Sequence, residues 1–146
     1  MATNLYVAYG SNMNIAHMAV RCPTAKVVGS TVLNGYQLIF RGRDGGAYAT
    51  VEENPNFQVP VMVWELDDLA EKRLDHYEGF PTLYRKEYLE IEFKGKTVQA
   101  MIYIMNDGRP IGMPDRHYYE GILEGYQEAG FNPIILDDAV RASDRG

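Results

Sequence analysis

The chain has 146 residues, of which 46% are hydrophobic, a formal net charge of −6 and a single cysteine. This is the length of one ordinary domain with a sizeable core, so we expect residues 1–146 to form a single domain. Nucleic acid is not an expected partner, because binding to phosphate relies on clustered Lys and Arg, and the basic residues here form no run. One cysteine excludes an intrachain disulfide.

The start of the chain, "MATNLYVAYG", lacks the basic segment and long apolar core of a signal peptide. No apolar run approaches the roughly 20 residues that a membrane-spanning helix needs. We therefore expect a cytoplasmic protein that has no membrane partner. A monomer and a homodimer both remain open.

The first predicted elements are a strand and a helix separated by a short turn. Residues 5–9 form an apolar run that indicates a buried strand ending at Gly10. Residues 13–21 then indicate a helix that Asn12 caps and that Pro23 forces to end.

Strands dominate the middle of the chain. Further strands are predicted over residues 30–40, 47–51 and 59–66, with a turn at Asn54-Pro55. The period then changes to that of a helix, which Asp67 or Asp68 caps and Gly79 ends.

The last third predicts a hairpin and two helices. Residues 84–93 and 97–105 are strand-like and are joined at residues 94–96, whereas residues 116–130 and 136–143 are helical. Because strands and helices do not alternate, a doubly wound parallel sheet is not expected. We predict an α+β fold, with a curled or barrel-like mixed sheet and a few helices outside it.

Common catalytic groups are missing from the pattern. No two of His17, His76 and His117 have the spacing of a metal-ligand pair, so no metal site is expected. Ser11 lies in "YGSNM", which lacks the second glycine of a nucleophile elbow. Cys22 lies at an expected helix C-terminus, where the dipole raises rather than lowers the pKa of a thiol. We expect no enzyme nucleophile.

Two stretches remain as candidates for a site. The turn at residues 10–12 offers backbone N–H groups that can bind a carboxylate or an oxyanion, although these residues taken alone favour a plain helix cap. Glu78 lies at a helix end among Tyr77, Phe80 and Tyr84. Enclosure by these rings would raise its pKa and suit a general acid and base, whereas exposure would leave it an ordinary surface residue.

Several segments, taken in order, resemble the γ-glutamylcyclotransferase superfamily, which includes the AIG2-like proteins. They are "YVAYGSNM" (6–13), "RCP" (21–23), "GGAYATV" (45–51), "VPVMVWEL" (59–66), "LDHYEGFPTLYRK" (74–86) and "PDRHYYEGILEGYQEAGF" (114–131). The resemblance implies a small mixed β-barrel flanked by helices, with a pocket at one mouth. It also implies a reaction without a cofactor, in which the α-amine of a γ-glutamyl compound attacks its own γ-carbonyl and releases 5-oxoproline.

The resemblance assigns Glu78 as the catalytic acid and base. It places the glutamyl group of a small-molecule substrate against eleven residues: Tyr6, Val7, Ala8, Tyr9, Gly10, Ser11, Asn12, Gly46, Ala47, Tyr84 and Tyr118. Asp115 departs from the family pattern, in which a Ser often follows the Pro, and it leaves the size of the substrate open. Two alternatives also stay open: a binding or regulatory module that keeps the pocket without turnover, and an interaction domain that uses exposed tyrosines.

Overall fold

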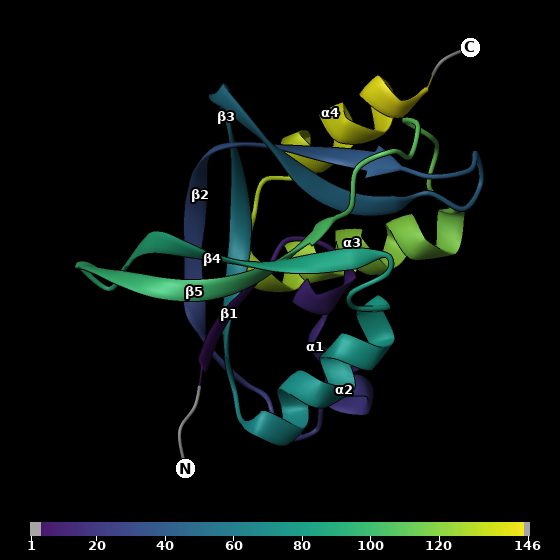
Figure 1. Cartoon of the computed structure of the whole chain (residues 1–146). Helices are drawn as coiled ribbons and strands as arrows, with labels where there is room; N and C mark the ends of the chain where they lie inside the picture. Colours follow the sequence, from purple (N-terminus) through teal and green to yellow (C-terminus); the bar gives the residue numbers. More distant parts are fainter. Residues whose placement is uncertain (1–3, 145–146) are drawn as a thin grey trace.

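One mixed five-stranded sheet, in the order β2-β3-β1-β5-β4, organises the computed structural model, which describes residues 4–144 (Figure 1). The strands are β1 (Asn4–Ala8), β2 (Lys26–Arg41), β3 (Tyr48–Leu66), β4 (Tyr84–Phe93) and β5 (Lys96–Met105). A one-turn 3-10 helix, η1 (Ser11–Met13), precedes α1 (Ile15–Arg21), and the other helices are α2 (Asp68–Glu78), α3 (Arg116–Ala129) and α4 (Ile134–Ser143). The predicted α+β class and mixed sheet are confirmed.

The sheet is curled, and its two edge strands approach each other. β1 pairs parallel to β5, whereas the other neighbouring strands pair antiparallel. At the edges, the Thr31 hydroxyl of β2 donates to the Glu92 carbonyl of β4 at 2.6 Å. Within residues 4–144 no backbone ladder joins β2 to β4, so the predicted barrel is approached without being closed.

The predicted ends of α2 and α3 are confirmed. Asp67 and Asp115 accept hydrogen bonds from the backbone N–H groups of Ala70 and Tyr118, so each carboxylate caps its helix. At the other ends, Gly79 and Gly130 adopt the left-handed conformation. α4 begins two residues before the predicted start.

The prediction that Asn12 caps the first helix is wrong. Residues 11–13 form the one-turn helix η1, and Asn14 caps α1 by accepting from the His17 N–H at 3.1 Å. The extra turn leaves the Asn12 side chain free of the capping role and carries it into the interior, where it is 3% exposed. A cap and a buried polar residue look alike in sequence, since both are Asn before a helix.

The predicted turn at Asn54-Pro55 is also wrong, because β3 runs through it. The ladder between β2 and β3 is irregular here, between the pairs Asn34↔Gln58 and Tyr36↔Glu53. Pro55 thus lies where no ladder partner needs its missing N–H, which is how a strand tolerates proline.

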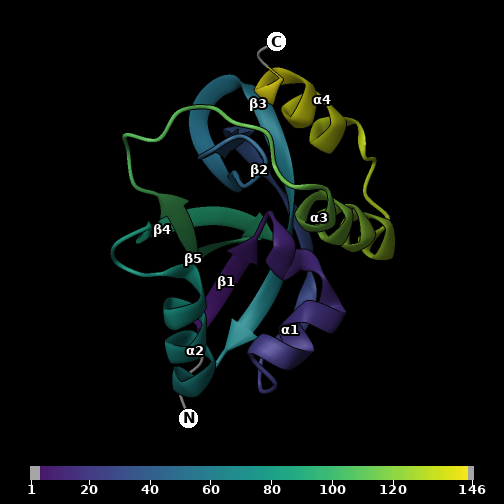
Figure 2. The ribbon, with the colours of Figure 1, turned by 90° about the vertical axis from the view of Figure 1, so that its right-hand side faces the viewer.

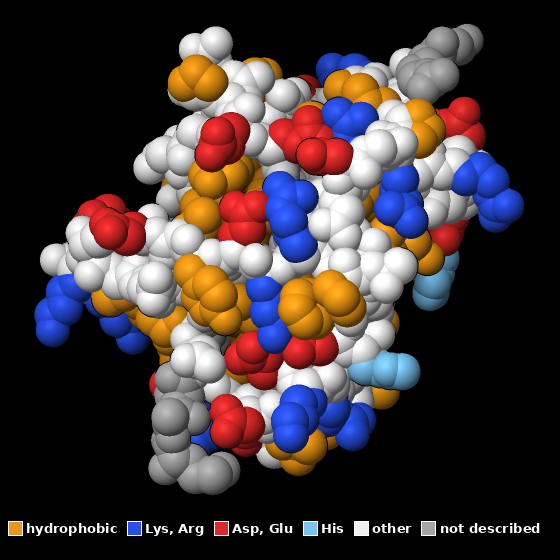
Figure 3. Space-filling view, viewed as in Figure 1, with side chains coloured by type: hydrophobic (Ala, Val, Ile, Leu, Met, Phe, Trp, Pro, Cys, Tyr) orange, Lys and Arg blue, Asp and Glu red, His pale blue; other side chains and the backbone are white. Residues whose placement is uncertain are grey.

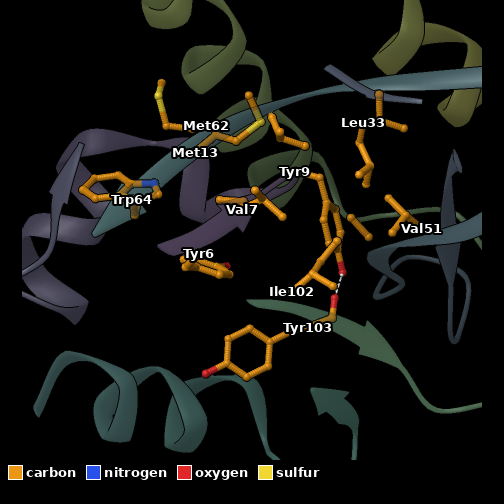
Figure 4. Close-up of a cluster of buried hydrophobic side chains, with 14 of the residues drawn as sticks. Tyr6, Val7, Tyr9, Met13, Leu33, Val51, Met62, Trp64, Ile102 and Tyr103 are labelled. Atoms are coloured by element: carbon orange, nitrogen blue, oxygen red, sulfur yellow. Dashed lines mark hydrogen bonds between the residues drawn. The ribbon is translucent and has the colours of Figure 1, made fainter. Parts of the chain in front are cut away.

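The carboxyl end of β1 is the point where the layers of the fold meet. Figure 2 shows this end between α2 and α3. Val7 is fully buried in the core that Figure 4 shows, and the Tyr9 hydroxyl donates to the Tyr103 carbonyl of β5 at 2.6 Å. The residues that follow β1 are therefore held against β5 before the chain enters η1.

On the face seen in Figure 3, acidic and basic side chains are interspersed. Residues 4–144 include no helix that is both long and apolar enough to cross a bilayer.

Candidate active site

A cavity of about 180 Å³ opens beside the end of β1. Segments far apart in the sequence contribute to its wall, and seven of the thirteen described lining residues are tyrosines. The lining residues are Tyr6, Tyr9, Gly10, Ser11, Asn12, Tyr48, Ala49, Tyr77, Glu78, Leu83, Tyr84, Tyr103 and Tyr118.

Most of the residues predicted for the site are brought together in this wall. Eight of them line the cavity: Tyr6, Tyr9, Gly10, Ser11, Asn12, Glu78, Tyr84 and Tyr118. Val7 and Ala8 lie in the hydrophobic core instead, and Gly46 and Ala47 are not among the lining residues.

Five lining residues were not predicted from the sequence: Tyr48, Ala49, Tyr77, Leu83 and Tyr103. Tyr48 and Ala49 come directly after the predicted Gly46 and Ala47, so a small shift along the strand separates prediction and structure. Tyr77 directly precedes Glu78 and is 46% exposed, which places its ring at the mouth of the cavity. Tyr103 carries no local signal, because β5 is apolar on both sides of it.

Among residues 4–144, Glu78 is the one acidic side chain in the wall. Its Oε1 accepts a hydrogen bond from the Asn12 amide Nδ2 at 2.9 Å. Burial raises the pKa of Glu78 to about 7, while the hydrogen bond from Asn12 and the charge of Arg21 act in the opposite direction. A carboxylate with this pKa gains and loses a proton readily near neutral pH, as a general acid and base must.

Asn12 connects Glu78 to two other groups. Its Nδ2 also donates to the Tyr6 hydroxyl oxygen at 2.9 Å. Its Oδ1 accepts from Nη1 of Arg21 at 2.7 Å, and the same nitrogen lies 3.1 Å from Oγ of Ser11. The Arg21 guanidinium is stacked 4.0 Å from the centre of the Tyr77 ring. One polar network thus runs from the mouth of the cavity to the carboxylate.

The tyrosine hydroxyls of the wall differ in whether their hydrogen atoms already have an acceptor. Tyr9 and Tyr84 donate theirs to the carbonyls of Tyr103 and Ala49, each at 2.6 Å. Tyr118 accepts from the Ala49 N–H at 3.0 Å, and Tyr6 accepts from Asn12. Within residues 4–144 no acceptor takes the hydroxyl hydrogens of Tyr6 and Tyr118, so these two groups can donate to a bound molecule.

The turn after β1 also lines the cavity, through Gly10, Ser11 and Asn12. A Cβ at Gly10 would lie 3.3 Å from Cβ of Ala49 and 3.8 Å from the Tyr118 hydroxyl, so glycine allows the chain to pass close to β3. Carbonyl oxygens of Gly10 and Ser11 accept from Met13 and Asn14. The N–H groups of Gly10, Ser11 and Asn12 have no acceptor in the part of the chain that the structure describes.

Other candidate groups lie outside the cavity. Cys22 is buried, and its thiol donates to the Ala70 carbonyl at 3.4 Å between α1 and α2. Asp75 receives the Tyr103 hydroxyl and the Lys86 ammonium. Among residues 4–144 no three His, Cys, Asp or Glu side chains gather as a metal site would require.

These features define a class of protein: a small α+β domain whose cavity encloses a protonatable carboxylate among tyrosines and unpaired backbone donors. The family model described as "Gamma-glutamyl cyclotransferase, AIG2-like" matches residues 6–123, and the chain belongs to this family. The resemblance inferred from the sequence motifs is thereby confirmed.

Named relatives agree with this assignment. The chain is 27% identical to the gamma-glutamylcyclotransferase of Homo sapiens, over 94% of this chain and 77% of that protein. It is 29% identical to the protein of the same name from Mus musculus, over 88% and 72% of the two chains. A solved structure titled "Gamma-glutamyl cyclotransferase" has a TM-score of 0.81 at 24% identity, covering 99% of this chain and 90% of that chain. This last likeness concerns the fold alone.

Proposed function

We propose that this protein is a γ-glutamyl cyclotransferase that converts a γ-glutamyl compound into 5-oxoproline and a free amine or amino acid. The observation that carries the proposal is the enclosure of Glu78, whose pKa is about 7, in a cavity that offers hydrogen-bond donors. Membership of the family and the names of the relatives support the same reaction.

In the proposed reaction the α-nitrogen of the substrate is the nucleophile. It loses a proton to Glu78, attacks the γ-carbonyl carbon and forms the lactam C–N bond as the original γ-amide C–N bond breaks. The α-nitrogen gives up two protons between its ammonium and lactam forms, and the leaving nitrogen gains two to depart as an ammonium. Glu78 can carry both in turn, because its pKa of about 7 permits either state.

The negative charge that develops on the γ-carbonyl oxygen requires donors that are already in place. The free N–H groups of the turn after β1 and the hydroxyl hydrogens of Tyr6 and Tyr118 are the available donors. Donors fixed by the fold stabilise an oxyanion without reorganisation during the reaction. The remaining task is to hold the flexible glutamyl chain in a curled shape, so that the amine lies close to its own carbonyl.

The test is incubation of the purified protein with a panel of γ-glutamyl amino acids, a γ-glutamyl peptide and a γ-glutamyl amine, with detection of 5-oxoproline by mass spectrometry. We expect 5-oxoproline from at least one of them, and a loss of about 10²–10⁴-fold in kcat for Glu78→Gln. Full activity in Glu78→Gln would overturn the assigned role of this residue.

Absence of 5-oxoproline with every compound would overturn the proposed activity. Calorimetric titration of the same panel then identifies the alternative, since a binding or regulatory module would bind a γ-glutamyl compound without converting it.

A further inference from the structure

We infer that Arg21 is a positioning residue, whose guanidinium fixes the orientation of the Asn12 amide and through it holds the Glu78 carboxylate for proton transfer. The inference rests on the proposed function for its meaning in catalysis. Its physical core is the chain of contacts from Arg21 through Asn12 to Glu78.

An amide side chain has two faces of opposite character, and its surroundings decide which face points where. The Arg21 guanidinium can only donate, so it must meet the acceptor Oδ1 of Asn12. The donor Nδ2 is then directed at Tyr6 and Glu78. Asn12 is 3% exposed, so bulk water is largely excluded as a substitute for Arg21.

Arg21 contacts α2 through its side chain and, separately, through its backbone. Its guanidinium is stacked on Tyr77, and its backbone carbonyl accepts from Nε of Arg73 at 2.8 Å. Arg21 is the last residue of α1, while Tyr77 and Arg73 belong to α2. The contact therefore ties the helix that follows η1 to the helix that carries Glu78.

Loss of Arg21 would change the protonation of Glu78 in a predictable direction. The positive charge of Arg21 favours the ionised carboxylate, and without it the pKa of Glu78 rises further. The freed amide can also turn its Oδ1 toward Glu78, an arrangement that only a protonated Glu78 tolerates. Both effects act in the same sense, so the base is formed at a higher pH.

The experiment compares Arg21→Lys, Arg21→Gln and the control Arg73→Gln in the pH dependence of kcat/KM. Arg73 is a neighbouring cation that donates to a backbone carbonyl and does not line the cavity. We expect the acidic limb of the pH profile of Arg21→Gln to move to higher pH. Below neutral pH, kcat/KM should fall about tenfold for each pH unit by which the limb moves. Arg21→Lys should recover part of this shift, and Arg73→Gln should show none.

A double-mutant cycle separates action through Asn12 from direct contact with substrate. If Arg21 acts through the amide, Arg21→Gln should lower activity much less in an Asn12→Ala background than in the natural chain. A direct role in binding would instead raise KM equally in both backgrounds. An equal loss in both backgrounds, or an unmoved pH limb, would overturn the inference.

The inference can fail separately from the proposed function. Titration of the Glu78 carboxyl carbon by NMR needs no turnover, so it reports on Arg21 even if no substrate is found. We expect a higher pKa of Glu78 in Arg21→Gln than in the natural chain and in Arg73→Gln. An unchanged pKa in a variant that folds, judged by its backbone NMR spectrum, would overturn the inference whether or not 5-oxoproline is formed.

Discussion

Two carboxylates, three residues apart on α2, lie in opposite electrostatic surroundings. Asp75 meets the Lys86 ammonium at 2.8 Å and accepts the Tyr103 hydroxyl at 2.6 Å. Glu78 meets a neutral amide at 2.9 Å and has no ion-pair partner among the described residues. We call Asp75 with Lys86, Tyr103 and Glu71 the Asp75 cluster. We call Glu78 with Asn12 the Glu78 cluster.

The difference between the clusters separates a structural use of charge from a chemical one. In the Asp75 cluster one ammonium lies between two carboxylates, 2.6 Å from Glu71 and 2.8 Å from Asp75, and so binds α2 to β4. In the Glu78 cluster the fold leaves a carboxylate without a full counter-charge, and burial raises its pKa to about 7. A lysine paired permanently with Glu78 would keep the carboxyl group in its ionised form. Glu78 could then no longer donate a proton as an acid.

The sharpest way to break the comparison is to remove the negative charge of Glu78 and that of Asp75 in turn. We expect Glu78→Gln to lower kcat for 5-oxoproline formation by about 10³-fold, since Gln cannot accept a proton. Asp75→Asn should retain most of the activity, because Asp75 does not line the cavity. Equal losses in the two variants would show that the clusters are not functionally distinct.

The second prediction concerns the lysine of the Asp75 cluster. Lys86→Met leaves Glu71 and Asp75 close together, partly buried and without their cation. We expect the free energy of unfolding to fall by about 3 kcal/mol, as measured by urea denaturation. The matched control is Arg116→Met, which breaks the exposed ion pair with Glu120 and should cost less than about 1 kcal/mol.

The third prediction is that a mutation at a functional residue, Glu78, stabilises the folded chain at high pH. The pKa of Glu78 is higher in the folded chain, about 7, than its ordinary value of 4.5. The folded state therefore holds the proton more tightly, and this contribution to stability is complete below about pH 4.5 and is lost as pH rises through 7.

Glu78→Gln keeps a neutral group at every pH. We expect this variant to match the natural chain in stability near pH 4 and to exceed it by about 3 kcal/mol near pH 9, in denaturation series at both pH values. A constant difference between the two proteins across this range would contradict the raised pKa.

The smallest expected effect lies at Tyr103, which links the Asp75 cluster to the wall of the cavity. The Tyr103 ring lines the cavity and meets the Tyr6 ring edge-on with centroids 5.6 Å apart, while its hydroxyl binds Asp75. Tyr103→Phe removes only the hydroxyl, and the bond from Tyr9 persists because it ends on the Tyr103 backbone. We expect a loss of about 1 kcal/mol in the free energy of unfolding and little change in kcat. A large fall in kcat would instead place this hydroxyl in the reaction.

Much of the fold was predictable because its signals are local. Asp67 and Gly79 bound α2, and the two-residue turn at Lys94-Gly95, where both residues have positive φ, joins β4 to β5. The predictions failed where a local signal has two readings, as with Asn12, whose side chain was taken for a helix cap. They also failed at Pro55, because a bulge opposite β2 makes room for a proline that would otherwise end the strand.

The residues of the site also fall into those that the sequence predicted and those that it could not predict. The motif containing Glu78 and the turn at residues 10–12 were found from the sequence. Tyr103 and the link from Arg21 to Asn12 could not be predicted, since Tyr103 lies in a strand of apolar neighbours and the link depends on where α1 ends relative to η1.

The sequence by itself determined the elements, the family and the chemical groups at hand, because propensity, caps and motifs act over a few residues. Only the tertiary structure decided what those groups can do. The pKa of Glu78 depends on which surfaces exclude water from it and on which side of the Asn12 amide faces it. Both are properties of segments that meet in space, and burial, unlike propensity, is set by the packing of the whole chain.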